Sequence, residues 1–271
     1  MSWLLSIVFP PPPSIFIGTM SAVSLMSLAY GGYSEVKGKN MQYSKFWNVN
    51  NLQKKKTLIG KEEVTELSGR TGMFILYTPA FLAGVVSFSI FPDEGLRFML
   101  VDAALTIHFL KRILEVLFIH KYSGKMVLDT VIPITLSYFI STASMIYAQH
   151  LTQGFPEPTV DLKYIGVALF FVGIGGNLYH HYLLSRLREK SDLGYKIPKE
   201  GMFNLVLCPH YLFEILGFVG VFFISQTLYS FSFTLGTLMY LMGRSYATRK
   251  WYLSKFENLS KEVKCLIPFV F

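Results

Sequence analysis

Seven long apolar stretches alternate with polar loops along the chain. Each holds about 20 mostly apolar residues, the length that an α-helix needs to cross the hydrocarbon core of a bilayer. Only Ser225 and Gln226 separate the last two stretches, which predicts a tight helical hairpin. The pattern predicts an all-α, polytopic membrane protein with seven transmembrane helices. The expected spans are residues 12–30, 72–91, 96–119, 127–149, 161–184, 203–224 and 227–246.

Composition agrees with a membrane protein. Hydrophobic residues make up 52% of the 271 residues, and the mean hydropathy is +0.41, both high for a soluble domain. The N-terminal apolar run is accompanied by no basic region and no small-residue cleavage site, so we expect no cleaved signal peptide.

The positive charges predict how the chain is oriented. All but four of the 25 Lys and Arg residues lie in loops 31–71, 120–126 and 185–202 or in the segment from Arg244 onward. With seven alternating helices these segments share one side, and Lys and Arg favour the cytoplasmic side. The C-terminus is therefore expected in the cytoplasm and the N-terminus outside or in a lumen. The net charge of +8 does not indicate nucleic acid, because the basic residues form no continuous face.

One predicted helix carries charged residues in its middle. His108, Lys111, Arg112 and Glu115 are spaced i, i+3, i+4 and i+7, which places all four on one face. A charge at this depth costs several kcal/mol unless it is paired or hydrated, so this face should line a protein interior or a wet cavity. An internal ion pair is one interpretation. Two cations beside one anion favour a site for an anionic ligand instead.

Two later helices add polar residues at a similar depth. Residues 161–184 and the loop that follows contain Asn177, His181 and Arg188, and residues 203–224 contain the sequence CPHYLFEILG. We expect these groups to share one pocket with the charged face. No metal is expected, because six histidines form no HExxH motif and the two cysteines have no zinc spacing. The glycines near residue 175 follow no strand, which excludes a Rossmann domain.

The C-terminal half resembles the steroid 5-alpha-reductase family. The resemblance rests on NLYHHYLLSRLR, GYKIPKEGMFNLVLCPHYLFEILG, GRSYATRKWYLSKFE and the final LIPFVF. The helix containing HFLKRILEVLFIHKYS looks closer to the very-long-chain enoyl-CoA reductases, and the whole is similar to plant-type members. The resemblance implies a single reductase domain over residues 1–271, embedded in the endoplasmic reticulum membrane. Its steroid 5-alpha-reductase-like part is expected at residues 120–271.

The resemblance also implies an activity. Family members use NADPH to reduce a carbon–carbon double bond conjugated to a carbonyl in a lipophilic substrate, which reaches the site from the bilayer. Hydride adds to the carbon beta to the carbonyl, so negative charge develops on the carbonyl oxygen and needs a donor. The helices should therefore surround a cavity for cofactor and substrate. A 3-oxo-4-ene steroid and a trans-2-enoyl-CoA remain alternative substrates, in steroid metabolism or fatty acid elongation.

Family positions imply two groups of site residues. The expected catalytic residues include Tyr211 as the leading proton donor, with Tyr77 and His108 as further candidates for stabilising the oxyanion. The catalytic group is Tyr211, Lys111, Arg112, Glu115, Tyr77 and His108. The cofactor-binding group is Asn177, His181, Arg188, Tyr195, His210, Glu214, Arg244 and Tyr252.

The sequence departs from the steroid branch at several of these positions. Tyr77 stands where steroid reductases have a glutamate, and Phe109 where they have a tyrosine, so the usual clamp on the steroid carbonyl is missing. His181 replaces an aspartate and Thr248 a histidine. These changes favour an enoyl thioester or another hydrophobic enone over a strict 4-ene-3-oxosteroid.

Two other functions remain open from the sequence. CPHYLFE is similar to part of the signature of isoprenylcysteine methyltransferases, which bind S-adenosylmethionine, although the preceding RHP is absent. Seven helices with an outside N-terminus also describe receptors and transporters, in which intramembrane charges mark a ligand path. The chain has no pair of matching broken helices of the kind typical of transporters.

Overall fold

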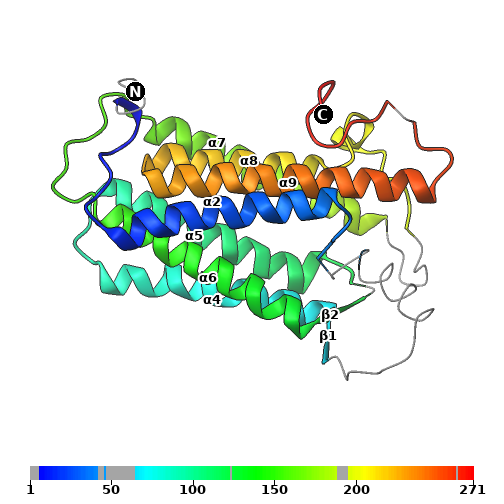
Figure 1. Ribbon diagram of the computed structural model, residues 1–271, viewed down its shortest axis with the longest axis horizontal. Helices are drawn as coiled ribbons and strands as arrows, with labels where there is room; N and C mark the ends of the chain where they lie inside the picture. The colour runs from blue at the N-terminus through cyan, green and yellow to red at the C-terminus, as the bar shows by residue number, and fades with distance from the viewer. Residues whose placement is uncertain (1–5, 42–45, 47–64, 123, 188–194, 261) are drawn as a thin grey trace.

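The structure is a computed structural model that describes residues 6–41, 46, 65–122, 124–187, 195–260 and 262–271. Each of the seven predicted stretches coincides with an α-helix in this part of the chain, so the protein is mostly helical (Figure 1). The helices are α2 (Ile15–Val36), α4 (Gly69–Ile90), α5 (Leu96–Leu114), α6 (Leu128–His150), α7 (Lys163–Arg186), α8 (Pro209–Ser225) and α9 (Leu228–Lys255).

Four of these helices, α2, α4, α6 and α7, are long and apolar enough to cross a membrane. Helix α8 is shorter, at 17 residues. Helix α5 contains the charged residues discussed above, which lower its mean hydropathy. Length and composition thus support four spans, and seven spanning helices remain a prediction.

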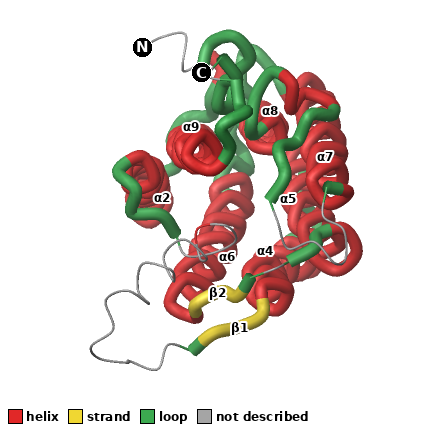
Figure 2. Tube along the Cα trace, turned by 90° about the vertical axis from the view of Figure 1, so that its right-hand side faces the viewer, coloured by secondary structure: helices red, strands yellow, loops and turns green. Residues whose placement is uncertain are grey.

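The helices run back and forth between two ends of an elongated bundle. One end, here called the sheet end, carries strands β1 (Glu66–Ser68) and β2 (Lys125–Val127), which pair antiparallel. The α8–α9 turn and the turn after α4 lie at the other end, here called the hairpin end (Figure 1). In the view toward the sheet end, α2 and α9 lie on one side of the bundle and α7 and α8 on the other (Figure 2). Helix α5 packs against α4 and also contacts α6, α7 and α8.

Three elements differ from the sequence prediction: the two strands and helix α8. The two short strands were not expected, because three residues are too few to show an alternating pattern. Helix α8 begins at Pro209 rather than at residue 203. Residues Gly201–Asn204 form a 3-10 helix, and Val206 then pairs with Lys264 of the C-terminal segment. Proline has no N–H to donate and favours the first turn of a helix, so α8 begins there.

Glycines let two helix pairs approach closely. A Cβ added at Gly173 of α7 would lie 2.4 Å from the backbone nitrogen of Gly217 in α8. A Cβ added at Gly243 of α9 would lie 2.1 Å from the carbonyl oxygen of Gly32 in α2. Small residues at such contacts stabilise helix pairs in a membrane through close packing of the backbones.

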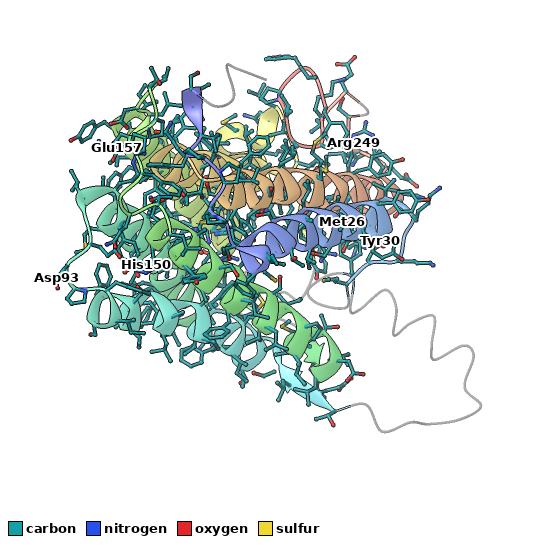
Figure 3. The ribbon with its side chains drawn as sticks, turned by 60° about the vertical axis from the view of Figure 1, so that its left-hand side comes forward. Met26, Tyr30, Asp93, His150, Glu157 and Arg249 are labelled. Carbon is teal, nitrogen blue, oxygen red and sulfur yellow. The ribbon has the colours of Figure 1, made fainter. Side chains whose placement is uncertain are left out.

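Polar contacts close the hairpin end. Arg97, which is buried, donates to Glu157 and to the carbonyl oxygen of Ile224, the latter over 2.6 Å. The predicted tight hairpin is present, with Gln226 in the left-handed conformation at φ 49°. His150 and Glu157 lie at this end in Figure 3, whereas Arg249 lies at the opposite end.

Candidate active site

A cavity of about 460 Å³ lies between the helices toward the sheet end. This volume is within the range of about 300–1,000 Å³ found for small-molecule sites. Apolar side chains such as Phe218 of α8 and Phe233 of α9 form one part of its wall. The loop between α5 and β2 contributes His120, Lys121 and Tyr122. The cavity lining is therefore apolar in one part and polar in the part formed by this loop.

Glu115 connects the charged residues next to this cavity. It is 0% exposed and begins η1 (Glu115–Ile119), a π-helical turn that continues α5. Its carboxylate accepts hydrogen bonds from Lys111 Nζ and Arg112 Nη1, each over 2.9 Å, and lies 3.0 Å from His181 Nδ1. Single π-turns inside helices occur frequently at functional sites. The π-turn places Glu115 where helices α5 and α7 meet.

The charged cluster extends from Lys111 to helix α8. The ammonium of Lys111 donates to the side-chain oxygen of Asn177 in α7. Asn177 in turn donates through Nδ2 to the carbonyl oxygen of His210, over 2.7 Å. Three helices are thereby linked through one polar chain. Among the described residues, Glu115 is the carboxylate that bonds both Lys111 and Arg112, and Glu214 of α8 also interacts electrostatically with both cations.

Arg112 links Glu115 to Tyr77. Its Nη2 donates to the Tyr77 hydroxyl over 2.6 Å, while Nη1 bonds the carboxylate. The Tyr77 ring stacks on Tyr138 of α6 with centroids 5.6 Å apart and packs against Phe109 of α5. A hydroxyl that accepts from a guanidinium is a stronger donor to a third group. Tyr77 is thus held at the cavity wall in a position suited to contact a carbonyl oxygen.

Most of the expected site residues line the cavity. They come from α4, α5, α7, α8, α9 and the loop before the 3-10 helix. Those that line it are Tyr77, His108, Arg112, His181, Tyr195, His210, Tyr211, Glu214, Arg244 and Tyr252. Lys111, Glu115 and Asn177 do not line it. Glu115 bonds Arg112 and Asn177 bonds His210, which both line the cavity, whereas Lys111 bonds Glu115 and Asn177. Arg188 lies outside the described residues.

Helix α9 forms a second polar wall. Arg244 and Thr248 lie one helical turn apart, and both line the cavity. Thr248 is 2% exposed, and its hydroxyl has no hydrogen-bond partner among the residues that the structure describes. Tyr252 follows one turn later and contacts Trp251, which packs on Tyr195 with centroids 4.9 Å apart. An unsatisfied buried hydroxyl beside a guanidinium indicates a place for a polar ligand group.

Three residues near the cavity are not indicated by any sequence pattern. Glu35 of α2 bonds Arg244 over 2.7 Å. His120 follows the third expected span, and its ring lies 4.8 Å from the His181 ring. The Tyr122 hydroxyl is buried and finds no partner in the described part of the chain. Burial raises the pKa of this phenol above its ordinary range, so it stays protonated and can donate.

A metal ion is the rival interpretation of the histidines. One ligand atom each from Glu115, His120 and His181 lies within 4.8 Å of the others. The carboxylate of this set already pairs with Lys111 and Arg112. A divalent cation would have to compete with both positive charges at short range. The charge distribution therefore favours stabilisation of an anion over metal binding.

Comparison with known proteins gives one consistent result. A family model described as 3-oxo-5-alpha-steroid 4-dehydrogenase matches residues 124–271. The steroid 5-alpha-reductase DET2 of Gossypium hirsutum is 40% identical over 107 residues, which are 39% of this chain and 42% of that protein. The 3-oxo-5-alpha-steroid 4-dehydrogenase 2 of Macaca fascicularis is 31% identical over 134 residues, which are 49% of this chain and 52% of that protein. The matches thus span about half the length of these curated relatives.

The matched region contains the C-terminal motifs on which the sequence resemblance rests, and that resemblance is confirmed. The result favours the reductase over the methyltransferase and over a receptor or transporter. Because the family model covers more than half of the chain, this protein belongs to the 3-oxo-5-alpha-steroid 4-dehydrogenase family.

Proposed function

We propose that this protein is an oxidoreductase that uses NADPH to reduce a carbon–carbon double bond conjugated to a carbonyl. Its substrate is a lipophilic enone that enters from the bilayer, either a 3-oxo-4-ene steroid or a trans-2-enoyl-CoA. The names of the two relatives, a steroid 5-alpha-reductase and a 3-oxo-5-alpha-steroid 4-dehydrogenase, support reduction of a steroid double bond. The observation that carries the proposal is the chain of contacts from Glu115 through Arg112 to Tyr77 at the cavity wall.

The α9 wall suits a nicotinamide dinucleotide. Arg244 offers a cation for a phosphate, and the hydroxyl of Thr248, which has no hydrogen-bond partner in the described part of the chain, lies one turn away. Tyr252, His210 and Glu214 extend the polar lining toward the charged cluster. When bound, NADPH supplies the hydride and its electron pair. The remaining chemistry falls to the side chains of the chain itself.

Tyr77 is proposed as the donor to the substrate carbonyl. As that oxygen gains negative charge, the hydrogen bond from Tyr77 strengthens, and the positive charge of Arg112 behind the phenol stabilises the anion. Tyr211 lines the same cavity, with its ring centroid 4.2 Å from that of His210, and is the proposed proton donor to the alpha carbon. Glu115 holds both cations in place without contacting the substrate.

The proposal is tested with the full chain in lipid nanodiscs. Conjugated enones, 4-ene-3-oxosteroids and trans-2-enoyl-CoAs are supplied in turn, and NADPH loss and product mass are recorded. The wild-type protein should consume NADPH only when one of these substrates is present. Tyr211→Phe and Lys111→Ala should abolish turnover while the protein remains folded. Tyr164→Phe is the control, because Tyr164 is 67% exposed and does not line the cavity.

Unchanged turnover in both site variants would refute the site assignment, and no turnover with any enone would refute the function. We also propose that the protein resides in the endoplasmic reticulum membrane with its N-terminus in the lumen. Support comes from the C-terminal ends of α2, α7 and α9, which border the basic segments in the sequence and lie at the sheet end (Figure 1).

A further inference from the structure

A buried ion pair joins the first and last long helices beside the cavity. Glu35 in the last turn of α2 and Arg244 of α9 are each 2% exposed, and Arg244 Nη1 donates to Glu35 Oε1 over 2.7 Å. Burying two charges costs more solvation energy than an exposed pair does, so such a pair is weak evidence for a purely stabilising role. Its position suggests a second role, in ligand binding.

Backbone packing fixes the separation of the two side chains. Gly32 and Gly243, each within one turn of the pair, bring α2 and α9 into backbone contact. Glu35 Oε1 also accepts from the backbone N–H of Met41, over 3.1 Å. The second oxygen, Oε2, is buried and accepts no hydrogen bond from the described residues. Glu35 is therefore held by its helix and by the segment after it, and it presents one fixed oxygen to Arg244.

The guanidinium of Arg244 is restrained on two sides. Glu35 bonds one edge, and the ring of Phe46 lies against its face, with the centroid 4.3 Å from Cζ. Arg244 and Thr248 line the cavity, whereas Glu35 does not. The carboxylate therefore sits behind the guanidinium as seen from the cavity. This arrangement resembles that of an anion-binding arginine whose direction is set by a second residue.

We propose that Glu35 is a positioning residue, which directs the Arg244 guanidinium toward a phosphate of the dinucleotide. The proposal rests on the proposed function and deepens it, because it assigns cofactor binding to a residue of α2. Arg–phosphate bonds are directional, so a guanidinium that rotates away loses most of the interaction. Thr248, whose hydroxyl has no partner among the described residues, is the neighbouring donor for the same ligand group.

Two possible roles of Glu35, positioning Arg244 and neutralising its charge, predict opposite effects of Glu35→Ala on cofactor binding. Glu35→Ala removes both the hydrogen-bond acceptor and the charge, so Arg244 loses its fixed direction. Glu35→Gln keeps an acceptor oxygen and removes only the charge. If position matters, Ala weakens cofactor binding and Gln restores it. If Glu35 only lowers the net charge of the site, both substitutions should tighten phosphate binding.

The experiment measures the Kd of NADPH, together with the KM for NADPH and kcat, on the full chain in nanodiscs. For Glu35→Ala we expect Kd and KM for NADPH to rise about tenfold, equivalent to about 1.4 kcal/mol, with kcat within about twofold. Glu35→Gln should bind NADPH within about threefold of the wild type. Asp102→Asn is the matched control: Asp102 is 1% exposed, bonds Ser87 and lies outside the cavity lining, so NADPH binding should not change.

Glu35→Asp keeps the proposal testable if the alanine variant does not fold. It retains the charge but shortens the side chain by one methylene, which moves the acceptor away, so it should also raise the Kd of NADPH. Equal Kd values for the wild type, Glu35→Ala and Glu35→Asp, or tighter binding by Glu35→Ala, would overturn the positioning role. Absence of NADPH binding by the wild type would instead refute the proposed function and this inference with it.

Discussion

Glu115 is the carboxylate that compensates two cations in the interior. Removing it by Glu115→Ala leaves Lys111 and Arg112 buried without their partner, and such a loss typically costs about 3–5 kcal/mol. We therefore expect a large drop in the free energy of unfolding, measured by chemical denaturation in micelles.

An exposed ion pair provides the control for Glu115. Glu66 bonds Lys125 over 2.9 Å, but the side chains are 31% and 58% exposed. Glu66→Ala should change stability by no more than about 1 kcal/mol. Equal effects of the two substitutions would contradict the view that Glu115 balances the buried charge.

Tyr122 offers a hydroxyl for which the described protein has no partner. If the hydroxyl contacts the bound substrate or cofactor, Tyr122→Phe should lower kcat/KM about tenfold, the value of roughly one hydrogen bond. The same change removes an unsatisfied buried group, so the thermal midpoint should stay constant or rise. Wild-type kcat/KM in the variant would show that the hydroxyl serves no ligand. Steady-state kinetics and a melting curve on one preparation suffice.

Residue spacing predicted part of the site. The charged face of α5 follows from the 3.6-residue period, so its four polar residues could be placed on one side from sequence alone. Glu35 could not be connected to Arg244, because the two are 209 positions apart and a single glutamate near a helix end resembles an interfacial residue. His120 and Tyr122 could not be assigned to the cavity from the sequence, because they lie in a loop. A loop has no helical periodicity from which the direction of a side chain could be predicted.

Helices α7 and α8 test how backbone contact holds the bundle together. Gly173→Ala places a methyl group against the backbone of Gly217 and should destabilise the protein by about 1–3 kcal/mol, as overpacking does. Gly175, two residues away on the same helix, has open space around its Cβ direction. Gly175→Ala should be neutral or slightly stabilising, because alanine favours helix more than glycine does. Similar melting temperatures for the two variants would contradict the close contact.

The existence of the helices was predictable, and some of their boundaries were not. An apolar run of about 20 residues predicts a helix, because the hydrocarbon core offers no water to the backbone N–H and C=O groups. These groups must then bond one another within the segment. The π-turn at Glu115 has no signal in the apolar pattern, and the start of α8 is set by Pro209 rather than by that pattern. Val206 pairs with Lys264 near the C-terminus, and no local sequence pattern predicts this pairing.

The distribution of charge between the two ends of the bundle predicts its orientation in the membrane. In sealed microsomes a C-terminal tag should be digested by added protease without detergent, because the proposed topology places the basic segments and the C-terminus in the cytoplasm. An N-terminal tag should be protected until detergent opens the vesicles. Protection of the C-terminal tag combined with digestion of the N-terminal one would reverse the proposed topology.

If the protein transfers hydride from NADPH to an enone, the cavity must hold both molecules at the same time. We therefore propose supplying NADPH deuterated at the transferable position, with the substrate that gives the highest turnover, and locating the label in the product by mass spectrometry and NMR. With the wild type we expect product that carries one deuterium on the carbon beta to the carbonyl. With Tyr211→Phe we expect no labelled product. Reduced product without deuterium at that carbon would contradict the proposed hydride transfer.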